Sequence, residues 1–196
     1  LKATGCAVHL IACDVGAADA AARLEASLAT LPPLRGIIHA AGVLDDGPVE
    51  TLGPERWLPV MIPKVAGSWN LHRMSLRRQM DFFVFFSAGA ALLGSVGQAN
   101  YSAANSVTDA IAGLRRASGL PALAIQWGGW TEVGMVGRLD EGGRERWRAK
   151  GMEFITPREG ARWLGELLGW NGGTVAVLPA NWPTYAAGVT EQGRRW

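Results

Sequence analysis

Short apolar runs bounded by turn residues recur along this chain, and segments with helical periodicity separate them. Alternation of strand and helix is typical of a parallel sheet with helices on both faces. We therefore predict an α/β fold, a doubly wound parallel sheet in three layers, as one domain over residues 1–196. The predicted strands are residues 7–13, 34–39, 82–86, 123–127 and 174–178.

The segments between these strands carry helix signals. Pro54 and Pro157 suit first-turn positions, whereas Pro63 should kink or divide the helix that contains it. The predicted helices are residues 18–31, 54–61, 63–76, 99–118, 140–150 and 157–168.

Composition excludes several classes of protein. With 19 basic and 17 acidic residues the formal charge is +2, too balanced to attract nucleic acid. Residues 82–108 carry no charge, but their many polar groups argue against a membrane span and for a buried strand that leads into a catalytic helix. His9, His39 and His72 lack metal-ligand spacing, so no metal site is predicted.

The number and spacing of the cysteines indicate the cellular compartment in which the protein works. Cys6 and Cys13 are the two cysteines, and they lie seven positions apart on one predicted strand, hence on opposite faces, which disfavours a disulfide or a metal pair. With no secretory leader pattern in the sequence, we expect a cytoplasmic protein.

A glycine-rich phosphate-binding turn is missing where a dinucleotide fold would carry it. Such a turn normally follows the first strand, yet no Gly-x-Gly-x-x-Gly precedes Gly42. Either the fold binds no dinucleotide, or the chain begins late in the domain. The strong apolar run at residues 7–13 favours the second explanation.

Tyr101, Asn105 and Lys64 form a candidate device for protonating a carbonyl. Residues i and i+4 share a helix face, so Tyr101 and Asn105 can line one crevice. A free phenol titrates near pH 10, and a neighbouring ammonium such as that of Lys64 would stabilise the phenolate. This combination predicts carbonyl reduction.

The motifs resemble those of a ketoreductase domain from a modular polyketide synthase, within the short-chain dehydrogenase/reductase superfamily. The resemblance covers nearly the whole chain. Members of that superfamily usually carry Tyr-x-x-x-Lys, whereas these ketoreductases resemble this chain in placing Asn at the later position and lysine on the preceding helix. The matching segments are residues 12–15, 36–47, 63–69, 97–105, 127–130 and 134–135.

This resemblance implies a Rossmann-like sheet truncated at its N-terminal side and an NADPH-dependent reduction of a β-ketoacyl chain. Tyr101 would protonate the forming alkoxide, and Lys64 and Asn105 would orient it and relay protons. The family serine expected thirteen residues before the tyrosine is replaced by Ala88. Ser87 is the candidate substitute, provided that the strand has ended and the loop re-aims its side chain.

The resemblance also implies binding and stereochemical residues. Asp14 would meet the adenine ring, although it also suits a turn or a helix cap. Leu44, Asp45 and Asp46 resemble the motif of ketoreductases that set a D (R-type) hydroxyl, and Leu93 stands where the opposite class tends to have tryptophan. The other expected cofactor-binding residues are Val15, Ala40, Ala41, Gly42, Trp127 and Gly128.

Partners and a lid follow from the same resemblance. Residues 135–150 would form a mobile lid over the acyl chain. The expected partners are an acyl carrier protein with a phosphopantetheine-tethered substrate, neighbouring synthase domains, and the missing N-terminal part of the same domain. Arg73, Arg77 and Arg78, or Arg115 and Arg116, are candidate contacts for an acidic carrier.

Two alternatives stay open. A catalytically silent, structural ketoreductase-like module is favoured by Ala88 and by the missing phosphate loop. A nucleotide-sugar epimerase or dehydratase shares the fold but expects lysine where Asn105 stands.

Overall fold

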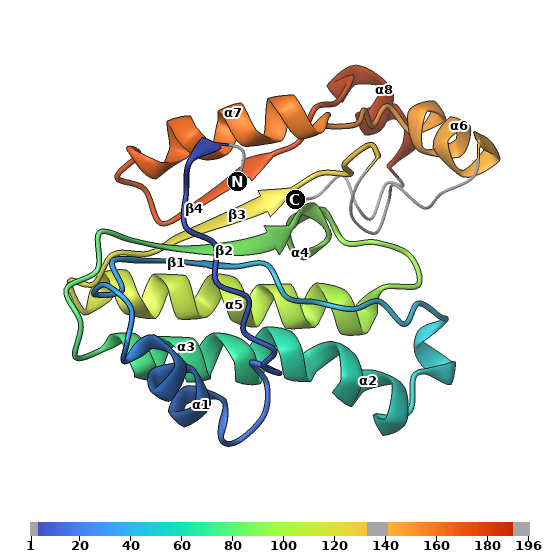
Figure 1. The fold of residues 1–196 in the computed structure, drawn as a ribbon. Coiled ribbons are helices and arrows are strands. Elements are labelled where there is room, and N and C mark those ends of the chain that lie inside the picture. Colours follow the sequence, from blue (N-terminus) through green and yellow to red (C-terminus); the bar gives the residue numbers. More distant parts are fainter. Residues whose placement is uncertain (1–3, 133–140, 190–196) are drawn as a thin grey trace.

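A parallel sheet forms the centre of the molecule. The computed structural model describes residues 4–132 and 141–189. Within these ranges β1 (Gly36–His39), β2 (Phe82–Ala88), β3 (Leu123–Trp127) and β4 (Thr174–Val177) run parallel in the order β1-β2-β3-β4 (Figure 1). Every residue of β3 is buried, as an apolar run in a central strand predicts.

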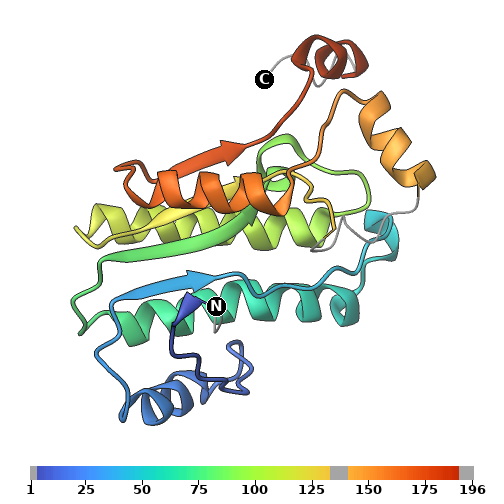
Figure 2. The same cartoon turned by 45° about the horizontal axis from the view of Figure 1, so that its top comes forward.

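Helices cover the sheet on both faces, so the predicted three-layer, Rossmann-like α/β fold is confirmed. On one side lie α1 (Ala20–Leu28), α2 (Pro54–Met61), α3 (Gly67–Ser75) and α5 (Ala99–Ala117); on the other lies α7 (Pro157–Leu168) (Figures 1 and 2). Phe83 and Phe85 of β2 face α3 and α5, whereas Val84 of β2 faces α7.

Pro63 divides the third predicted helix, as expected. Residues Ile62–Ala66 form a π-helical turn, η3, between α2 and α3. Proline lacks the N–H that an α-helix interior requires, so the chain widens here into i→i+5 bonding. The widened turn carries Lys64, which is buried at 3% exposure.

Several short elements were not predicted. These are η2 (Val49–Thr51), α4 (Gly89–Leu93) and α8 (Trp182–Gly188). Each is too short to show a repeated helical period in the sequence. α6 (Glu141–Ala149) agrees with the predicted helix over residues 140–150.

The predicted strand over residues 7–13 is wrong. This segment forms no strand, and Leu10 is 92% exposed. Its apolar pattern suits a strand, but a strand also needs a neighbour for its N–H and C=O groups, and none of the described residues supplies one. β1 is the border strand of the sheet on this side.

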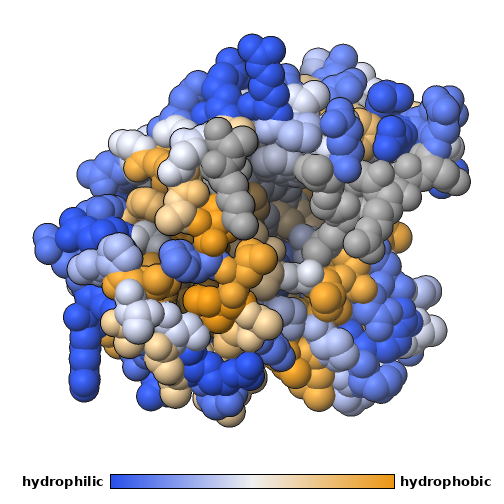
Figure 3. Space-filling model, viewed as in Figure 1, coloured by the Kyte–Doolittle hydropathy of each residue, from blue (hydrophilic) through white to orange (hydrophobic). Residues whose placement is uncertain are grey.

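The sheet face opposite α3 and α5 is incompletely covered near β1. Ile38 of β1 is 45% exposed, and Phe82 at the start of β2 is half-buried. Apolar surface is visible in the middle of the molecule, between the polar outer helices (Figure 3). In the described ranges, no helix combines the length and the apolar composition of a membrane crossing.

Candidate active site

The first turns of α5 position Tyr101 and Asn105. After β2, α4 and a turn at Gly97 (φ 78°) lead the chain into α5, and this positive φ suits glycine. Asn105 is completely buried, and its Nδ2 donates to the Tyr101 carbonyl oxygen at 2.8 Å. Asn105 Oδ1 is buried without a partner among the described residues. The amide is therefore held in place while its oxygen stays available.

Tyr101 lies half-buried at the carboxyl edge of the sheet. Burial raises the pKa of its phenol, the Asn105 amide pulls that pKa down, and the Asp46 carboxylate raises it further. No cation contributes to this pKa, so in this arrangement the phenol is a weaker acid than free tyrosine.

Lys64 lies below this edge, on η3. Its ammonium donates a hydrogen bond to the Phe86 carbonyl oxygen. Burial lowers the pKa of Lys64 to about 8, and the charge of Asp109 acts in the opposite direction. The side chain therefore remains mostly protonated at neutral pH. Its partners are on β2 and α5, and the expected contact with the Tyr101 hydroxyl remains a prediction.

A polar cluster surrounds this lysine inside the protein. We call Lys64, Ser87, Asp109 and Gln126 the inner cluster. Gln126 Nε2 donates to Asp109 Oδ2 at 2.8 Å, and Gln126 pairs with Ser87 in the β2–β3 register. Burial raises the pKa of Asp109, while Ser87, Gln126 and Lys64 each lower it. The Ser87 hydroxyl and Asp109 Oδ1 are buried and complete no hydrogen bond of normal geometry within the described residues.

Ser87 and Ala88 have opposite orientations. β2 continues through Ala88, whose backbone is extended (φ −138°, ψ 147°), so the strand has not ended at Ser87. Successive strand residues face opposite sides of a sheet. Ser87 therefore faces α5 and Asp109, and the condition under which it would replace the missing serine is not met.

A second polar cluster lies on the outside of the α5 N-terminus. Its members, Asp45, Asp46, Arg56, Gln98 and Asn100, form the outer cluster. Arg56 Nε donates to Asp45 Oδ1 at 2.9 Å, and Gln98 Nε2 donates to Asp46 Oδ2 at 2.9 Å. Asn100 Nδ2 donates to the carbonyl oxygens of Asp45 at 2.9 Å and Arg56 at 3.1 Å.

The outer cluster holds Asp45 and Asp46, two of the expected stereochemical residues, beside the N-terminus of α5. Gly47 N donates to the Gly97 carbonyl oxygen at 2.8 Å, so residues 45–47 lie beside the turn that precedes α5. Leu93 ends α4 and is half-buried, as is Leu44. The sequence missed Arg56, Gln98 and Asn100 because long-range hydrogen bonds leave no local pattern.

The residues expected at the adenine side form a turn. Asp14 Oδ1 accepts from Gly16 N at 2.9 Å, which agrees with the turn interpretation of this aspartate. Asn70 Nδ2 donates to the carbonyl oxygens of Val15 and Ala17, both at 2.9 Å. A Cβ on Gly67 would meet the side chain of Val15 at 3.0 Å and that of His39 at 3.3 Å. Val15 therefore lies next to the end of β1 and to η3.

The remaining expected cofactor residues follow β1 and β3. Ala40 is exposed, and Ala41 and Gly42 are half-buried, so backbone at the end of β1 is open to a ligand. Trp127 is 5% exposed and packs against Phe86 and Trp130, with ring centroids 5.4 Å and 5.0 Å away. Trp127 is thus a core residue, although its Nε1 is buried without a described partner.

These residues fit two parts of a nicotinamide dinucleotide. The open backbone after β1 and the turn at Asp14 suit its nicotinamide and adenosine ends. The described residues include no glycine-rich turn for its phosphates. Residues 135–140 of the expected lid lie outside the described residues; most of the rest forms α6, which lies beyond the carboxyl ends of the strands (Figure 1).

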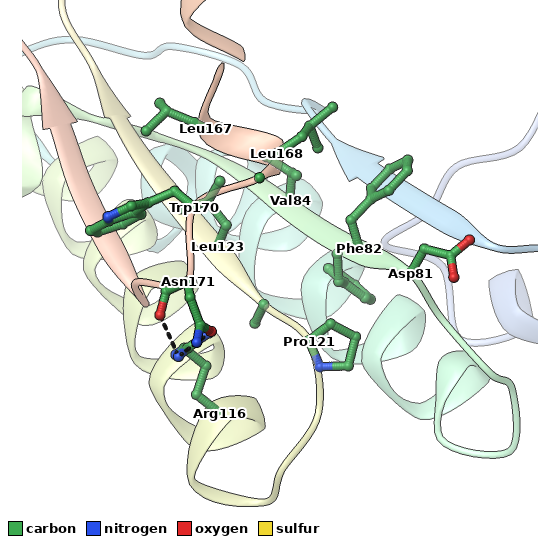
Figure 4. Close-up of a pocket in the computed structure, with 13 residues that line it drawn as sticks. Asp81, Phe82, Val84, Arg116, Pro121, Leu123, Leu167, Leu168, Trp170 and Asn171 are labelled. Carbon is green, nitrogen blue, oxygen red and sulfur yellow. Dashed lines mark hydrogen bonds between the residues drawn. The ribbon is translucent and has the colours of Figure 1, made fainter. Parts of the chain in front are cut away.

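A pocket of about 300 Å³ lies at the opposite edge of the sheet (Figure 4). Asp81, Pro121 and Asn171, which line it, precede β2, β3 and β4 respectively. Ligands of open α/β sheets bind outside the carboxyl ends of the strands, so this pocket is not the candidate site. Arg116 Nη2 donates to the Asn171 carbonyl oxygen there at 2.8 Å.

Arg115 is not a surface contact for a carrier protein. It is completely buried, with Nη1 2.7 Å from Ser75 Oγ and its guanidinium 4.1 Å from the centre of the Phe83 ring. Burial lowers its pKa to about 10. Arg73 and Arg77 are exposed. Among the described residues, no three His, Cys, Asp or Glu side chains gather as a metal site would require.

Comparison with known proteins identifies the family. The family model described as the KR domain matches residues 1–132. The chain belongs to the KR domain family. KR is the ketoreductase domain of polyketide synthases, so the predicted relationship is confirmed.

Relatives of this KR domain are large synthases. The chain is 40% identical to polyketide synthase GfsE of Streptomyces halstedii over 86% of its length, and 42% identical to mycoketide-CoA synthase of Mycobacterium tuberculosis over 81%. It spans 4% of each of these proteins. A solved structure of A-type ketoreductases from a modular polyketide synthase matches with a TM-score of 0.86 at 35% identity, covering 94% of this chain and 39% of the other.

Proposed function

We propose that this KR domain catalyses NADPH-dependent reduction of a carrier-protein-bound β-ketoacyl thioester to the β-hydroxyacyl thioester, with a D-configured hydroxyl, in polyketide biosynthesis. One observation carries the proposal. Tyr101 lies above the buried Asn105 at the carboxyl edge of a parallel sheet, and the charged Lys64 lies on the adjoining π-helical turn.

Each residue has a chemical task in this proposal. NADPH, when bound, supplies the hydride that the β-carbon accepts. Tyr101 donates its hydroxyl proton to the carbonyl oxygen as that oxygen gains charge. Lys64 stabilises the phenolate and returns a proton to it, which requires its ammonium to move from the Phe86 carbonyl oxygen toward the phenol. Asn105 Oδ1, which has no described partner, can hold a water in the relay.

Partners and location belong to the same proposal. The substrate would be tethered through phosphopantetheine to an acyl carrier protein, beside other synthase domains and in the cytoplasm. The exposed Arg73 and Arg77 offer positive charge to an acidic carrier. Stereochemical control would come from the Asp45–Asp46 segment, which the outer cluster holds beside the α5 N-terminus.

A silent, structural module is the second candidate. Two observations favour it: Ala88 provides no hydroxyl for the substrate carbonyl, and the Ser87 side chain faces α5 and Asp109 on the other side of the sheet. Losing one oxyanion donor typically costs about 10²- to 10³-fold in rate. That loss slows an enzyme without abolishing its chemistry.

Substitution of Tyr101 separates the two candidates. NADPH oxidation with a β-ketoacyl thioester surrogate is measured for the wild type and for Tyr101→Phe. We expect the substitution to lower kcat/KM by about 10²- to 10⁴-fold, the typical contribution of a positioned acid. Tyr185, the second of two tyrosines, provides the matched control Tyr185→Phe, which should retain the wild-type rate. Equal inactivity of all three proteins, with NADPH binding intact, would establish the silent module.

A further inference from the structure

Asp109 was not among the residues expected from the sequence, yet it lies on the catalytic face of α5. Tyr101, Asn105 and Asp109 follow one another at intervals of four, so they occupy one helix face. Tyr101 is half-buried at the edge of the sheet, Asn105 is completely buried one turn farther along α5, and Asp109 is half-buried one turn farther again. The row leads from the proposed proton donor along α5 to the inner cluster.

The interior end of this row meets Lys64 through neighbouring strands. Lys64 donates to the carbonyl oxygen of Phe86, and the next residue of β2, Ser87, pairs with Gln126 of β3. Gln126 Nε2 in turn holds Asp109 Oδ2 at 2.8 Å. Asp109 Oδ1 is buried and completes no hydrogen bond of normal geometry within the described residues, although Ser87 interacts with this carboxylate and lowers its pKa. Gln126 thus holds one carboxylate oxygen, and Ser87 faces the same carboxylate.

Among the described residues, His39 and Asp109 are the titratable groups whose pKa responds to the charge of Lys64. His39, at the end of β1, is 2% exposed, and its pKa is lowered to about 4, first by burial and then by the charge of Lys64. It is therefore neutral at pH 7 and adds no charge. Asp109 is the charged group that favours the ammonium form of Lys64. A buried ammonium without such a partner is costly to keep charged, so its pKa falls and the folded state is destabilised.

We propose that Asp109 is a positioning residue that acts through Lys64: it is the counter-charge that keeps the lysine ammonium charged on the η3 turn, from which it can reach the phenol. This inference rests on the proposed function for its catalytic meaning. Asp109 touches neither Tyr101 nor the reacting carbonyl in this account, and its effect passes entirely through the state of Lys64.

Titration of Lys64 tests the inference directly. The chain has only three lysines, Lys2, Lys64 and Lys150, so lysine-selective labelling allows each ammonium to be followed by NMR against pH. Lys64→Met assigns the signal, and Lys150, which is exposed, serves as an internal reference. We expect Asp109→Asn to lower the titration midpoint of Lys64 by about one pH unit or more and to leave Lys150 unchanged. Asp81→Asn, at the exposed Arg35 pair, is the matched control and should shift neither signal.

The pH dependence of kcat/KM provides a second measurement, which should not change if Asp109 has only a structural role. In Asp109→Asn the alkaline limb of the kcat/KM profile should move to lower pH together with the Lys64 midpoint, and Asp109→Glu should restore part of the shift. An unchanged Lys64 midpoint in a folded Asp109→Asn protein would overturn the inference, even if reduction proceeds. If the wild type does not reduce the ketoacyl surrogate but Asp109→Asn still shifts the Lys64 midpoint, the proposed function is wrong and the Asp109–Lys64 interaction is confirmed.

A double variant tests the inference if the single variant does not fold. Should Asp109→Asn alone fail to fold, the double variant Lys64→Met with Asp109→Asn removes both charges. We expect the double variant to recover the wild-type circular dichroism, because the unpaired buried cation was the fault. A double variant that stays unfolded would show that Asp109 has a packing role only.

Discussion

The outer and inner clusters flank the same helix, but they differ in how completely their polar groups are paired. In the outer cluster, Asn100 makes three hydrogen bonds: two through Nδ2 and one from Tyr101 N to its Oδ1 at 2.7 Å. In the inner cluster, Ser87 Oγ and Asp109 Oδ1 are buried and complete no hydrogen bond of normal geometry within the described residues, although Ser87 lowers the pKa of Asp109. Buried polar atoms are normally paired, so this incomplete pairing distinguishes the inner cluster from the outer one.

Burial and charge sharpen this difference. Lys64 is 3% exposed, and its pKa is displaced to about 8, whereas Arg56 and Asp45 of the outer cluster form a partly exposed ion pair. Displaced pKa values mark functional sites because proton transfer needs groups that can change state near neutral pH. Under the proposed function, the outer cluster holds the α5 N-terminus in place, and the inner cluster keeps Lys64 charged.

Among the changes that test the difference between the clusters, the largest effect should come from restoring a hydroxyl at the end of β2, next to Ser87. Ala88→Ser places an Oγ on the strand face opposite Ser87, at the position where the family serine is expected. If carbonyl positioning is the missing function, reduction should accelerate by about 10²- to 10³-fold. Turnover of the ketoacyl surrogate measures this gain, and Ala90→Ser, two residues farther along, is the control. Equal rates for the two variants would contradict a defect at Ala88.

Loss of Asn100 should cost more stability than any other change in the outer cluster. Its three hydrogen bonds join the Asp45 loop, α2 and the first turn of α5. Each is worth about 1 kcal/mol, so Asn100→Ala should lower the free energy of unfolding by about 3 kcal/mol in urea denaturation. Asn171→Ala, at an exposed position, should stay within about 0.5 kcal/mol. A comparable loss of unfolding free energy in both variants would contradict a stabilising role for the outer cluster.

Much of this architecture could be predicted because it follows from local patterns. The strand at Leu123–Trp127 and the helices at Pro54–Met61 and Pro157–Leu168 have the predicted bounds, since apolar runs and first-turn prolines mark them. Tyr101 and Asn105 share a helix face, as their spacing requires. In contrast, residues 7–13 have the pattern of a strand but no described neighbour. An apolar pattern shows that a segment can form a strand, but whether a neighbouring strand is present to pair with it depends on the fold as a whole.

The inner cluster shows the same limit at the level of single residues. Asp109 lies eight residues after Tyr101, and this spacing could have identified it as a member of the same face. Its partner Gln126 could not be found this way, because the β2–β3 register brings the two together. Ser87 does not meet the condition for its expected role for a physical reason: β2 ends at Ala88, two residues beyond the predicted end of the strand at Phe86.

Acid should destabilise the protein through His39, the neutral neighbour of Lys64. In the unfolded chain an imidazole binds a proton near pH 6.5, but burial lowers the pKa of His39 to about 4 in the folded protein. Between these values the unfolded state holds more protons, so stability falls as the pH falls. The loss between pH 7 and pH 5 should be about 2 kcal/mol.

Urea denaturation at several pH values measures this loss. His39→Gln should flatten the dependence relative to the wild type, while His9→Gln, at an exposed position, should leave it unchanged. Identical curves for the wild type and His39→Gln would mean that the interior near Lys64 already admits a charged imidazole. The inner cluster would then be more accessible to charge than its burial indicates, and it would differ less from the outer cluster.

The smallest expected effect is on the pKa of Tyr101, and it shows whether the outer cluster influences the acidity of the phenol as well as the position of α5. The charge of Asp46 raises the pKa of Tyr101, so Asp46→Asn should lower that pKa. Ultraviolet titration of the phenolate follows the change, and a Tyr185→Phe background leaves Tyr101 as the only tyrosine. Asp46 also accepts from Gln98, so Gln98→Ala in the same background separates loss of the hydrogen bond from loss of the charge. If only Asp46→Asn shifts the titration, the loop influences the proton donor by its field; if both shift it equally, the loop acts by holding the α5 N-terminus in place.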